Sequence, residues 1–367
     1  MKPSATQRPW PWQARQGYPW DGIQVFTGRD PLETDGGVPL WPWQLVYEEW
    51  GPPGGEPVVV FHALTGFSHA AARSAAEPAG WWQRVVGPGL GLDTSRYHIL
   101  CFNVLGGAMG STGPSSLDAE GRPWGSRFPR LTLFDIARGA NQLIEHWTDR
   151  PVTIVGGSMG GMLAYAYAAL FPAMVAGIFT IGAPIRHEPW AIAYHTVGRA
   201  AIVNDPHFQG GDYYGGPYPD TGLATARMAD MISYQHPESM GLKFGRKRQP
   251  PHFDDFEVTS YLGYQGQKLV SRYDANSYLV LTRAMDEFGL TSQQMHDLAR
   301  TPVWMLGMES DLLYLPQEIS EHARILEAHG VSVELKWLSG PWGHDTFLVD
   351  QEQAGQAAGA FLAAMAT

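Results

Sequence analysis

The chain has 367 residues, of which 44% are hydrophobic and 17% charged, a composition typical of a globular protein with a full core. Its formal net charge of −11 argues against nucleic acid or an anionic membrane as the main partner. The single cysteine excludes an internal disulfide. No segment approaches the ~20 apolar residues of a membrane span, and the first residues have no apolar stretch typical of a signal peptide, so we expect a cytoplasmic protein.

The N-terminal third predicts an arm followed by the first strands of a sheet. Residues 1–40 are rich in Pro, Trp and Gly without clear periodicity, and we expect an irregular arm there. Residues 43–49 alternate as an edge strand does. The continuous apolar runs 57–61 and 97–104 predict strands that are buried on both faces.

The loop after residue 61 reads His62-Ala63-Leu64-Thr65-Gly66. In enzymes with a nucleophile elbow, the loop after this strand supplies one backbone N–H that stabilises an oxyanion, and the Leu64 amide is our candidate. His62 is either catalytic or structural, and we favour a structural role because another histidine is better placed later in the chain.

A nucleophile-elbow motif lies in the middle of the chain. The β-branched run 152–155 leads into Gly156-Gly157-Ser158-Met159-Gly160, and small residues at helical spacing follow over 163–170. This strand–turn–helix context favours an exposed, reactive Ser158, with the Met159 amide as a second oxyanion donor at the helix N-terminus. The alternative is a glycine-rich turn with a serine that takes no part in chemistry.

Strands and helices alternate around this motif, which predicts a parallel, doubly wound sheet. A helix is expected over 133–147 and a strand over 175–181. Over 185–295 the strand rhythm is lost, and helical patterns at 190–202, 221–234 and 277–284 alternate with loops. We interpret 185–295 as a helical lid inserted into a core formed by 41–184 and 296–367, although a second independent domain is the alternative.

The sheet pattern resumes near residue 301 and carries two further candidate residues. Strands are expected at 301–307 and 331–338, with helices at 317–329 and 351–366. Asp311 and His344 each follow one of these strands, so the order Ser158, Asp311, His344 matches the α/β-hydrolase order of nucleophile, acid and base. A serine hydroxyl needs an imidazole to accept its proton, and the imidazole needs a carboxylate that fixes its tautomer. Taken singly, Asp311 and His344 are also compatible with ordinary loop positions.

The sequence resembles the homoserine O-acetyltransferase family, which has the α/β-hydrolase fold with a helical lid and acts in methionine biosynthesis. The motifs of this resemblance run in order from about residue 60 through the lid: His62-Ala-Leu-Thr-Gly66, Asn103-Val-Leu-Gly-Gly107, Gly110-Ser-Thr-Gly-Pro-Ser-Ser116, Gly156-Gly-Ser-Met-Gly-Gly-Met162, Val197-Gly-Arg199, Gly210-Gly-Asp-Tyr-Tyr214, Ala226-Arg-Met228, Lys243-Phe-Gly-Arg246, Tyr264-Gln-Gly266, Asp274-Ala-Asn-Ser-Tyr278, Leu281-Thr-Arg-Ala284 and Gly343-His-Asp345.

The resemblance implies an acyl-CoA-dependent transfer of an acetyl group to the γ-hydroxyl of L-homoserine. It implies Ser158 as nucleophile, Asp311 as acid, His344 as base, and the Leu64 and Met159 amides as the oxyanion hole. Arg227, Tyr234 and Asp345 are implied as homoserine contacts, with Arg227 suited to the carboxylate and Asp345 to the ammonium group. It further implies acetyl-CoA as a co-substrate without a tightly bound cofactor or metal, small-molecule substrates as the only partners, and a homodimer.

Three positions depart from the pattern of that family. Phe67 stands where the family usually has an acidic residue, Ala108-Met109 replace a pair that usually contains cysteine, and Gly263 replaces a commoner arginine. We expect these positions near the path of the acyl group or CoA, so a succinyl donor stays open, as does serine as the acceptor. An esterase or thioesterase with the same triad, or a binding protein on a hydrolase fold, are the remaining alternatives.

Overall fold

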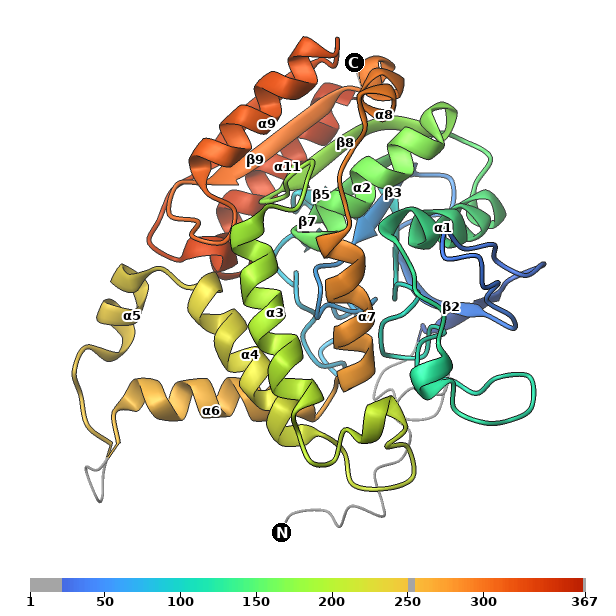
Figure 1. The fold of residues 1–367 in the computed structure, drawn as a ribbon. Coiled ribbons are helices and arrows are strands. Elements are labelled where there is room, and N and C mark those ends of the chain that lie inside the picture. Colours follow the sequence, from blue (N-terminus) through green and yellow to red (C-terminus); the bar gives the residue numbers. More distant parts are fainter. Residues whose placement is uncertain (1–21, 250–254, 366–367) are drawn as a thin grey trace.

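The computed structural model describes residues 22–249 and 255–365, which are built around one central sheet (Figure 1). The sheet has eight strands in the order β1-β2-β6-β3-β7-β8-β9-β10. From β6 to β10 all pairings are parallel, whereas β2 runs antiparallel to both of its neighbours. The strands are Gln24–Thr27 (β1), Gln44–Trp50 (β2), Glu56–Phe61 (β3), Tyr97–Phe102 (β6), Val152–Gly157 (β7), Val175–Ile181 (β8), Val303–Met308 (β9) and Val333–Leu338 (β10).

Helices cover both faces of the sheet, so the central strands are apolar throughout. Ile154 of β7 belongs to the hydrophobic cluster that includes α1 and α2, and its neighbour Val155 belongs to the cluster on the other face with α11. This burial on both sides explains why β3, β6 and β7 are continuous apolar runs without alternation. The helices flanking the sheet are Leu133–Trp147 (α1), Met159–Leu170 (α2), Pro316–Ala328 (α9), Thr346–Val349 (α10) and Gln351–Met365 (α11).

Most of the predicted elements are confirmed. In α1, a capping interaction of side chains with the backbone determines where the helix begins. Thr132 caps this helix: its hydroxyl accepts from the Asp135 amide, and the Asp135 carboxylate accepts from the Thr132 amide. The prediction for 43–49 was wrong in one respect, because β2 lies between β1 and β6 and the edge strand is β1. β1 also corrects the irregular arm expected over 1–40, of which residues 1–21 lie outside the described part.

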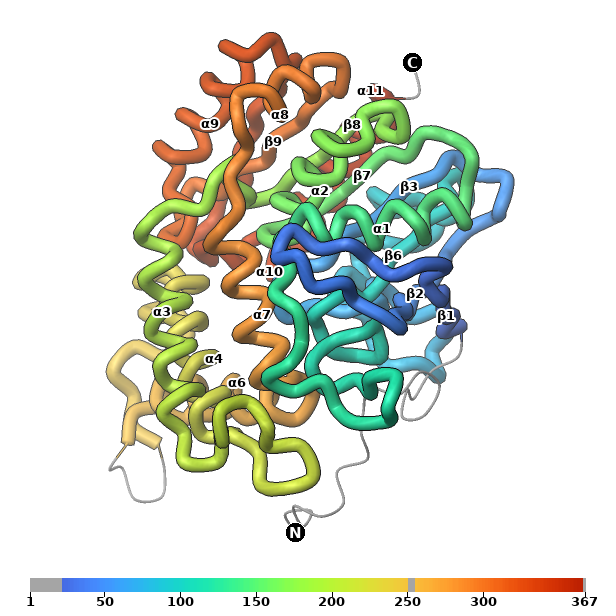
Figure 2. Tube along the Cα trace, turned by 45° about the vertical axis from the view of Figure 1, so that its right-hand side comes forward, coloured from blue at the N-terminus to red at the C-terminus, as the bar shows by residue number. Residues whose placement is uncertain are grey.

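Between β8 and β9 the described chain is helical. The helices over residues 189–286 lie together at one end of the sheet, below it in Figure 1, and the 45° turn in Figure 2 shows them still grouped there, whereas the short helix over residues 292–297 lies near the top of both views. The helices at 237–244 and 257–270 were not predicted. The bounds are Pro189–Val203 (α3), Asp220–Tyr234 (α4), Pro237–Phe244 (α5), Glu257–Val270 (α6), Ala275–Asp286 (α7) and Ser292–Asp297 (α8).

Two further features complete the described chain. A small parallel pair, β4 (Val86–Gly87) with β5 (Leu92–Asp93), lies outside the main sheet. No helix within residues 22–249 and 255–365 has both the length and the apolar character needed to cross a membrane.

Close backbone packing holds the turn between β7 and α2. A Cβ atom on Gly160 would lie 2.0 Å from the carbonyl oxygen of Phe61, and one on Gly156 would lie 2.3 Å from the carbonyl oxygen of Gly160. Both contacts are with backbone atoms, which cannot rotate away as a side chain can. Glycine at these two positions therefore lets α2 pack directly against β3 and β7.

We predict that Gly160→Ala destabilises the protein by about 1–3 kcal/mol, because the backbone must move to accept the methyl group. Thermal and urea unfolding measure this change. Gly241→Ala is the matched control: a Cβ there has no atom within 4 Å, and Gly241 lies in α5, where alanine is the better helix former. A Gly160→Ala protein that unfolds at the wild-type midpoint would contradict the packing argument.

Candidate active site

Ser158 lies at the sharp turn where β7 ends and α2 begins. Its φ of 55° and ψ of −123° are unusual for a residue with a side chain, and such strain costs about 1–3 kcal/mol. The Ser158 amide donates to the carbonyl oxygen of Ile181 on β8 at 2.8 Å, which ties the turn to the neighbouring strand. The strained turn thus has a fixed position in the sheet.

The structure brings Ser158, His344 and Asp311 into one hydrogen-bonded chain. Nε2 of His344 lies 2.9 Å from Oγ of Ser158, and its Nδ1 lies 2.7 Å from Oδ2 of Asp311. All three are buried, with 1–6% of each residue exposed. These residues are 186 and 33 positions apart in sequence, and only the convergence of three loops at the sheet edge makes them neighbours.

Asp311 is held by the backbone of its own loop. Its Oδ1 accepts from the Leu313 and Tyr314 amides at 2.8 and 3.0 Å, which leaves Oδ2 for His344. Burial by itself lowers the pKa of His344, but the charge and hydrogen bond of Asp311, with the charge of Asp345, outweigh it and raise this pKa above 6.5. With Asp311 accepting from Nδ1–H, the neutral imidazole has its free lone pair on Nε2, facing Ser158.

The two predicted oxyanion donors belong to two different segments, α2 and the loop after β3. Met159 is the first residue of α2, where backbone N–H groups have no acceptor within the helix. Leu64 is buried in the loop after β3, and this loop is fastened from the helical segment: Tyr273 donates to the Leu64 carbonyl at 2.7 Å, and Arg272 donates to the Thr65 carbonyl at 2.6 Å.

His62 takes the structural role that we favoured. Its Nε2 accepts from the Val104 amide at 3.2 Å, so the hydrogen is on Nδ1, which lies 2.8 Å from the Ala63 carbonyl oxygen. Burial lowers the pKa of His62 to about 4, so the ring is neutral. A neutral ring with both nitrogens engaged joins the loop after β3 to the end of β6.

The predicted substrate contacts gather where α4 packs on the single 3₁₀ turn Gly343–Asp345 (η5) that carries His344. The guanidinium carbon of Arg227 lies 5.4 Å from the centre of the Tyr234 ring, and this ring lies 5.6 Å from that of His344. Asp345 follows His344 directly and accepts from Nε2 of Gln235 at 2.8 Å. A cation on α4, Arg227, and an anion on η5, Asp345, therefore lie where these two elements pack together, next to His344.

Charge near these residues is balanced by several groups. Burial raises the pKa of Asp345, and the charges of Arg227, His344 and Lys243 with the Gln235 bond act against this rise. Burial also raises the pKa of Asp230, one turn after Arg227, to about 6, although the Arg227 charge and the Tyr278 hydroxyl oppose it. One carboxylate oxygen of Asp230 has no hydrogen-bond partner among the described residues.

Sequence reasoning missed several groups that shape the site, namely Asp230, Gln235, Arg272, Tyr273 and Tyr314. Tyr314 lies three residues after Asp311, and its buried side chain packs 5.1 Å from the His344 ring. Its position in the same turn as the predicted acid was a usable signal. Arg272 and Tyr273 reach the loop after β3 across more than 200 residues, and no local pattern marks such a contact.

Of the three positions that depart from the family pattern, Phe67 contacts a residue that also bonds the loop after β3. The Arg272 guanidinium carbon lies 5.7 Å from the centre of the Phe67 ring. Burial, followed by the charge of Arg227, lowers the pKa of Arg272 to about 10, so this cation stays protonated near neutral pH. Gly263 lies on α6, where a Cβ would meet no atom within 4 Å.

The sequence of this chain is similar to a known family model and to named proteins. A family model described as alpha/beta hydrolase fold matches residues 56–351. A homoserine O-acetyltransferase of Symbiobacterium thermophilum is 44% identical over 346 residues, which cover 89% of this chain and 90% of that protein.

Solved structures with the same fold include two differently named proteins. A homoserine O-acetyltransferase from Bacillus anthracis superposes with a TM-score of 0.84 at 22% identity, covering 93% of this chain and 97% of that one. Esterase E22 also gives a TM-score of 0.84, at 23% identity, with 93% and 99% coverage. At these identities the likeness concerns the fold, and it does not distinguish the two activities.

We predict that acetylation of Ser158 slows as the pH falls through an ionisation above 6.5, because protonated His344 cannot accept the serine proton and its pKa is raised. The burst of p-nitrophenol released from p-nitrophenyl acetate, followed against pH, measures this ionisation. Asp311→Asn should lower both the apparent pKa and the rate. Asp297→Asn, an exposed acid on α8, is the control and should leave the profile unchanged. A wild-type ionisation below 6.5 would contradict the prediction.

Proposed function

The chain belongs to the homoserine O-acetyltransferase family of the α/β-hydrolase fold, and we propose that it transfers acetyl groups from acetyl-CoA to the γ-hydroxyl of L-homoserine through Ser158. The observation that carries this mechanism is the buried hydrogen-bonded chain Ser158–His344–Asp311, beside one cation and one anion suited to an amino acid. The product is O-acetylhomoserine, and methionine biosynthesis is the process in which such a transfer takes place.

In the first half-reaction Ser158 takes the acetyl group. Its hydroxyl proton passes to Nε2 of His344 while Oγ attacks the thioester carbon, and the oxyanion accepts from the Leu64 and Met159 amides. The carbon–sulfur bond then breaks, and the departing thiolate takes the proton from His344. The result is free CoA and an acetyl ester on Ser158.

In the second half-reaction homoserine takes Ser158's acetyl group. His344 accepts the γ-hydroxyl proton as that oxygen attacks the ester carbon, and the same two amides bind the oxyanion. When the bond to Oγ breaks, Oγ recovers the proton from His344, so the enzyme returns to its starting state. Arg227 pairs with the homoserine carboxylate and Asp345 with its ammonium group, which places the γ-hydroxyl at Ser158.

The helical segment 185–295 acts as a lid in this proposal. Water would hydrolyse the acetyl enzyme, so transfer to homoserine requires a site from which water is excluded. The packing of α4 on η5, and the bonds from Arg272 and Tyr273 to the loop after β3, support this role. The core then comprises 41–184 and 296–367.

A homodimer and a cytoplasmic location complete the proposal. Large apolar side chains are exposed on α3, α4 and α5, including Val197 at 57%, Ile232 at 53% and Leu242 at 66%. Such a concentration on neighbouring helices is typical of a surface that is covered by a partner. The small-molecule substrates require no further macromolecule.

We predict rapid CoA release from acetyl-CoA when homoserine is present, and no more than one equivalent per chain without an acceptor. Parallel reactions with succinyl-CoA or with serine test the alternative donor and acceptor, and mass spectrometry identifies the ester. Ser158→Ala should lower turnover by about 10⁴-fold or more, because it removes the nucleophile. Continuous CoA release that homoserine does not accelerate would instead indicate a thioesterase.

We predict that Arg227→Ala raises the homoserine concentration for half-maximal rate by about 10–100-fold, because the carboxylate loses its cation, and leaves the CoA burst unchanged. Arg227→Lys should recover part of the loss, since it keeps the charge without the planar fork. Arg283→Ala, an exposed arginine on α7, is the matched control. An equal loss in the burst would remove Arg227 from the homoserine site.

A further inference from the structure

Asp230 is a buried carboxyl group on the face of α4 that carries two of the predicted substrate contacts. It lies three residues after Arg227 and four before Tyr234, and residues at these spacings share one face of a helix. This face meets the site, because the Arg227 guanidinium carbon lies 5.4 Å from the centre of the Tyr234 ring, which lies 5.6 Å from that of His344. Asp230 itself is 1% exposed, and no step of the mechanism above uses it.

The two oxygens of this carboxyl group differ in their surroundings. The Tyr278 hydroxyl on α7 donates to Oδ1 of Asp230 at 2.8 Å. Oδ2 is also buried and has no hydrogen-bond partner within residues 22–249 and 255–365, so Arg227 does not occupy it. A buried carboxylate oxygen without a donor is costly, because it has lost its bonds with water and gained none in return. Such an oxygen in a native structure calls for a functional explanation.

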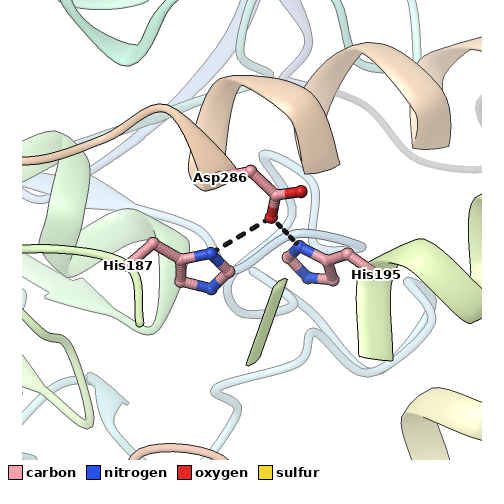
Figure 3. Close-up of side chains that lie close together, drawn as sticks. All are labelled: His187, His195 and Asp286. Carbon is pink, nitrogen blue, oxygen red and sulfur yellow. Dashed lines mark hydrogen bonds and ion pairs between the residues drawn. The ribbon is translucent and has the colours of Figure 1, made fainter. Parts of the chain in front are cut away.

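Asp286, the last residue of α7, shows how another carboxylate of the helical segment is satisfied (Figure 3). Nδ1 of His195 lies 2.7 Å from Oδ1 of Asp286, and Nδ1 of His187 lies 3.1 Å from the same oxygen. Arg199 pairs with Oδ2 at 2.6 Å, so both oxygens have a nitrogen partner within the protein. We call these four residues the cluster at Asp286.

Asp274, which caps the start of α7, is buried and also has a donor on each oxygen. Its Oδ1 accepts from the Tyr213 hydroxyl at 2.6 Å, and its Oδ2 accepts from the Tyr214 hydroxyl at 2.9 Å. Carboxylates of this segment that join its elements are therefore paired on both sides. Asp230 differs from them in having one oxygen open to a donor from outside the chain.

An α-amino acid offers such a donor in the right place. Its carboxylate and its ammonium group are attached to the same carbon atom, so the residues that hold them must be neighbours. Residues three apart on a helix have Cβ atoms about 5–6 Å apart, which suits this requirement. Arg227 can hold the carboxylate while Oδ2 of Asp230 accepts from one N–H of the ammonium group and Asp345 on η5 accepts from another.

We propose that Asp230 is a further substrate-binding residue, which accepts a hydrogen bond from the α-ammonium group of the acceptor through Oδ2. The inference rests on the proposed acetyl transfer to an amino acid, and it concerns the acceptor site and not the chemistry on Ser158. Because Oδ2 is buried, an acceptor without an ammonium group leaves it unpaired. Asp230 thus favours amino acids over hydroxy acids that lack the amino group.

The test compares homoserine with 4-hydroxybutanoate, which has the same carboxylate and hydroxyl groups but no ammonium group. Calorimetry in the Ser158→Ala background gives the dissociation constant of each compound without turnover. Asp230→Asn keeps the shape of the side chain and removes its charge, and we predict about 10–100-fold weaker homoserine binding with unchanged 4-hydroxybutanoate binding. Equal losses for the two compounds, or a wild-type constant for homoserine in folded Asp230→Asn protein, would overturn the proposal.

Steady-state kinetics separate this role from a structural one. In Asp230→Asn the half-saturating homoserine concentration should rise about 10–100-fold, whereas the CoA burst from acetyl-CoA, which precedes acceptor binding, should be unchanged. Asp205→Asn is the matched control, because this buried carboxylate contacts the N-terminal part of the same helix through the Gly222 amide at 2.7 Å. Thermal unfolding of both variants measures any loss of stability. The same rise in both variants would show that Asp230 acts only on the packing of α4.

The failure of the proposed function can be distinguished from the failure of this inference. If the wild type acetylates serine and not homoserine, serine is compared with 3-hydroxypropanoate, and a loss for serine alone would uphold the role of Asp230 with another acceptor. If the wild type acetylates homoserine and Asp230→Asn discriminates as well as the wild type, only this inference fails. If neither amino acid binds or is acetylated, Asp230 has no acceptor to hold and both proposals fail.

Discussion

The strained backbone of Ser158 is the constraint on which the other features of the site depend. A residue with a side chain does not adopt φ of 55° and ψ of −123° unless its surroundings hold it there. The close contacts of Gly156 and Gly160 with backbone atoms, and the bond from Ser158 to Ile181 on β8, provide that support. Because β7 is central in the sheet, the loops after β3 and β9 can approach the same hydroxyl, and the turn after β10 can bring His344 to it. The sheet therefore determines where the reaction can take place.

The charges around Ser158 are those that the proposed amino-acid substrate would need. An amino acid brings both a carboxylate and an ammonium group, so a site of a single sign would repel one end. Arg227 on α4 and Asp345 beside His344 supply the two signs from different parts of the chain, and each acts on the other through charge. Asp230, with a pKa raised to about 6 by burial, lies one turn from Arg227 and adds a second carboxyl group. The positive charges of Arg227, His344 and Lys243 act against the effect of burial on Asp345, which favours the ionised carboxylate at a site that is partly closed to water.

Elements and site residues could be predicted from the sequence where a local residue pattern has a direct physical cause. The apolar runs of β3, β6 and β7 and the elbow glycines report their surroundings directly, and the order of Ser158, Asp311 and His344 identified the residues that the structure brings together. β1 was missed because a four-residue strand in a Pro- and Trp-rich region has little periodicity. Arg272, Tyr273 and the cluster at Asp286 could not be found, because each depends on contacts between segments far apart in sequence.

The cluster at Asp286 shows how the helical segment is joined to the chemistry. His195 and Arg199 lie on α3, Asp286 lies near the end of α7, and His187 lies in the loop between β8 and α3. A movement of α3 relative to α7 would alter the contacts of Asp286, and through His187 it would reach the hydroxyl of Tyr314, whose ring packs 5.1 Å from the His344 ring. Arg272 and Tyr273 provide a second connection, from the residues before α7 to the loop that carries the Leu64 amide. The ring of His344, through Tyr314, and the loop that carries the Leu64 amide are thus both in contact with the helical segment, so the arrangement of that segment is physically coupled to the geometry at Ser158.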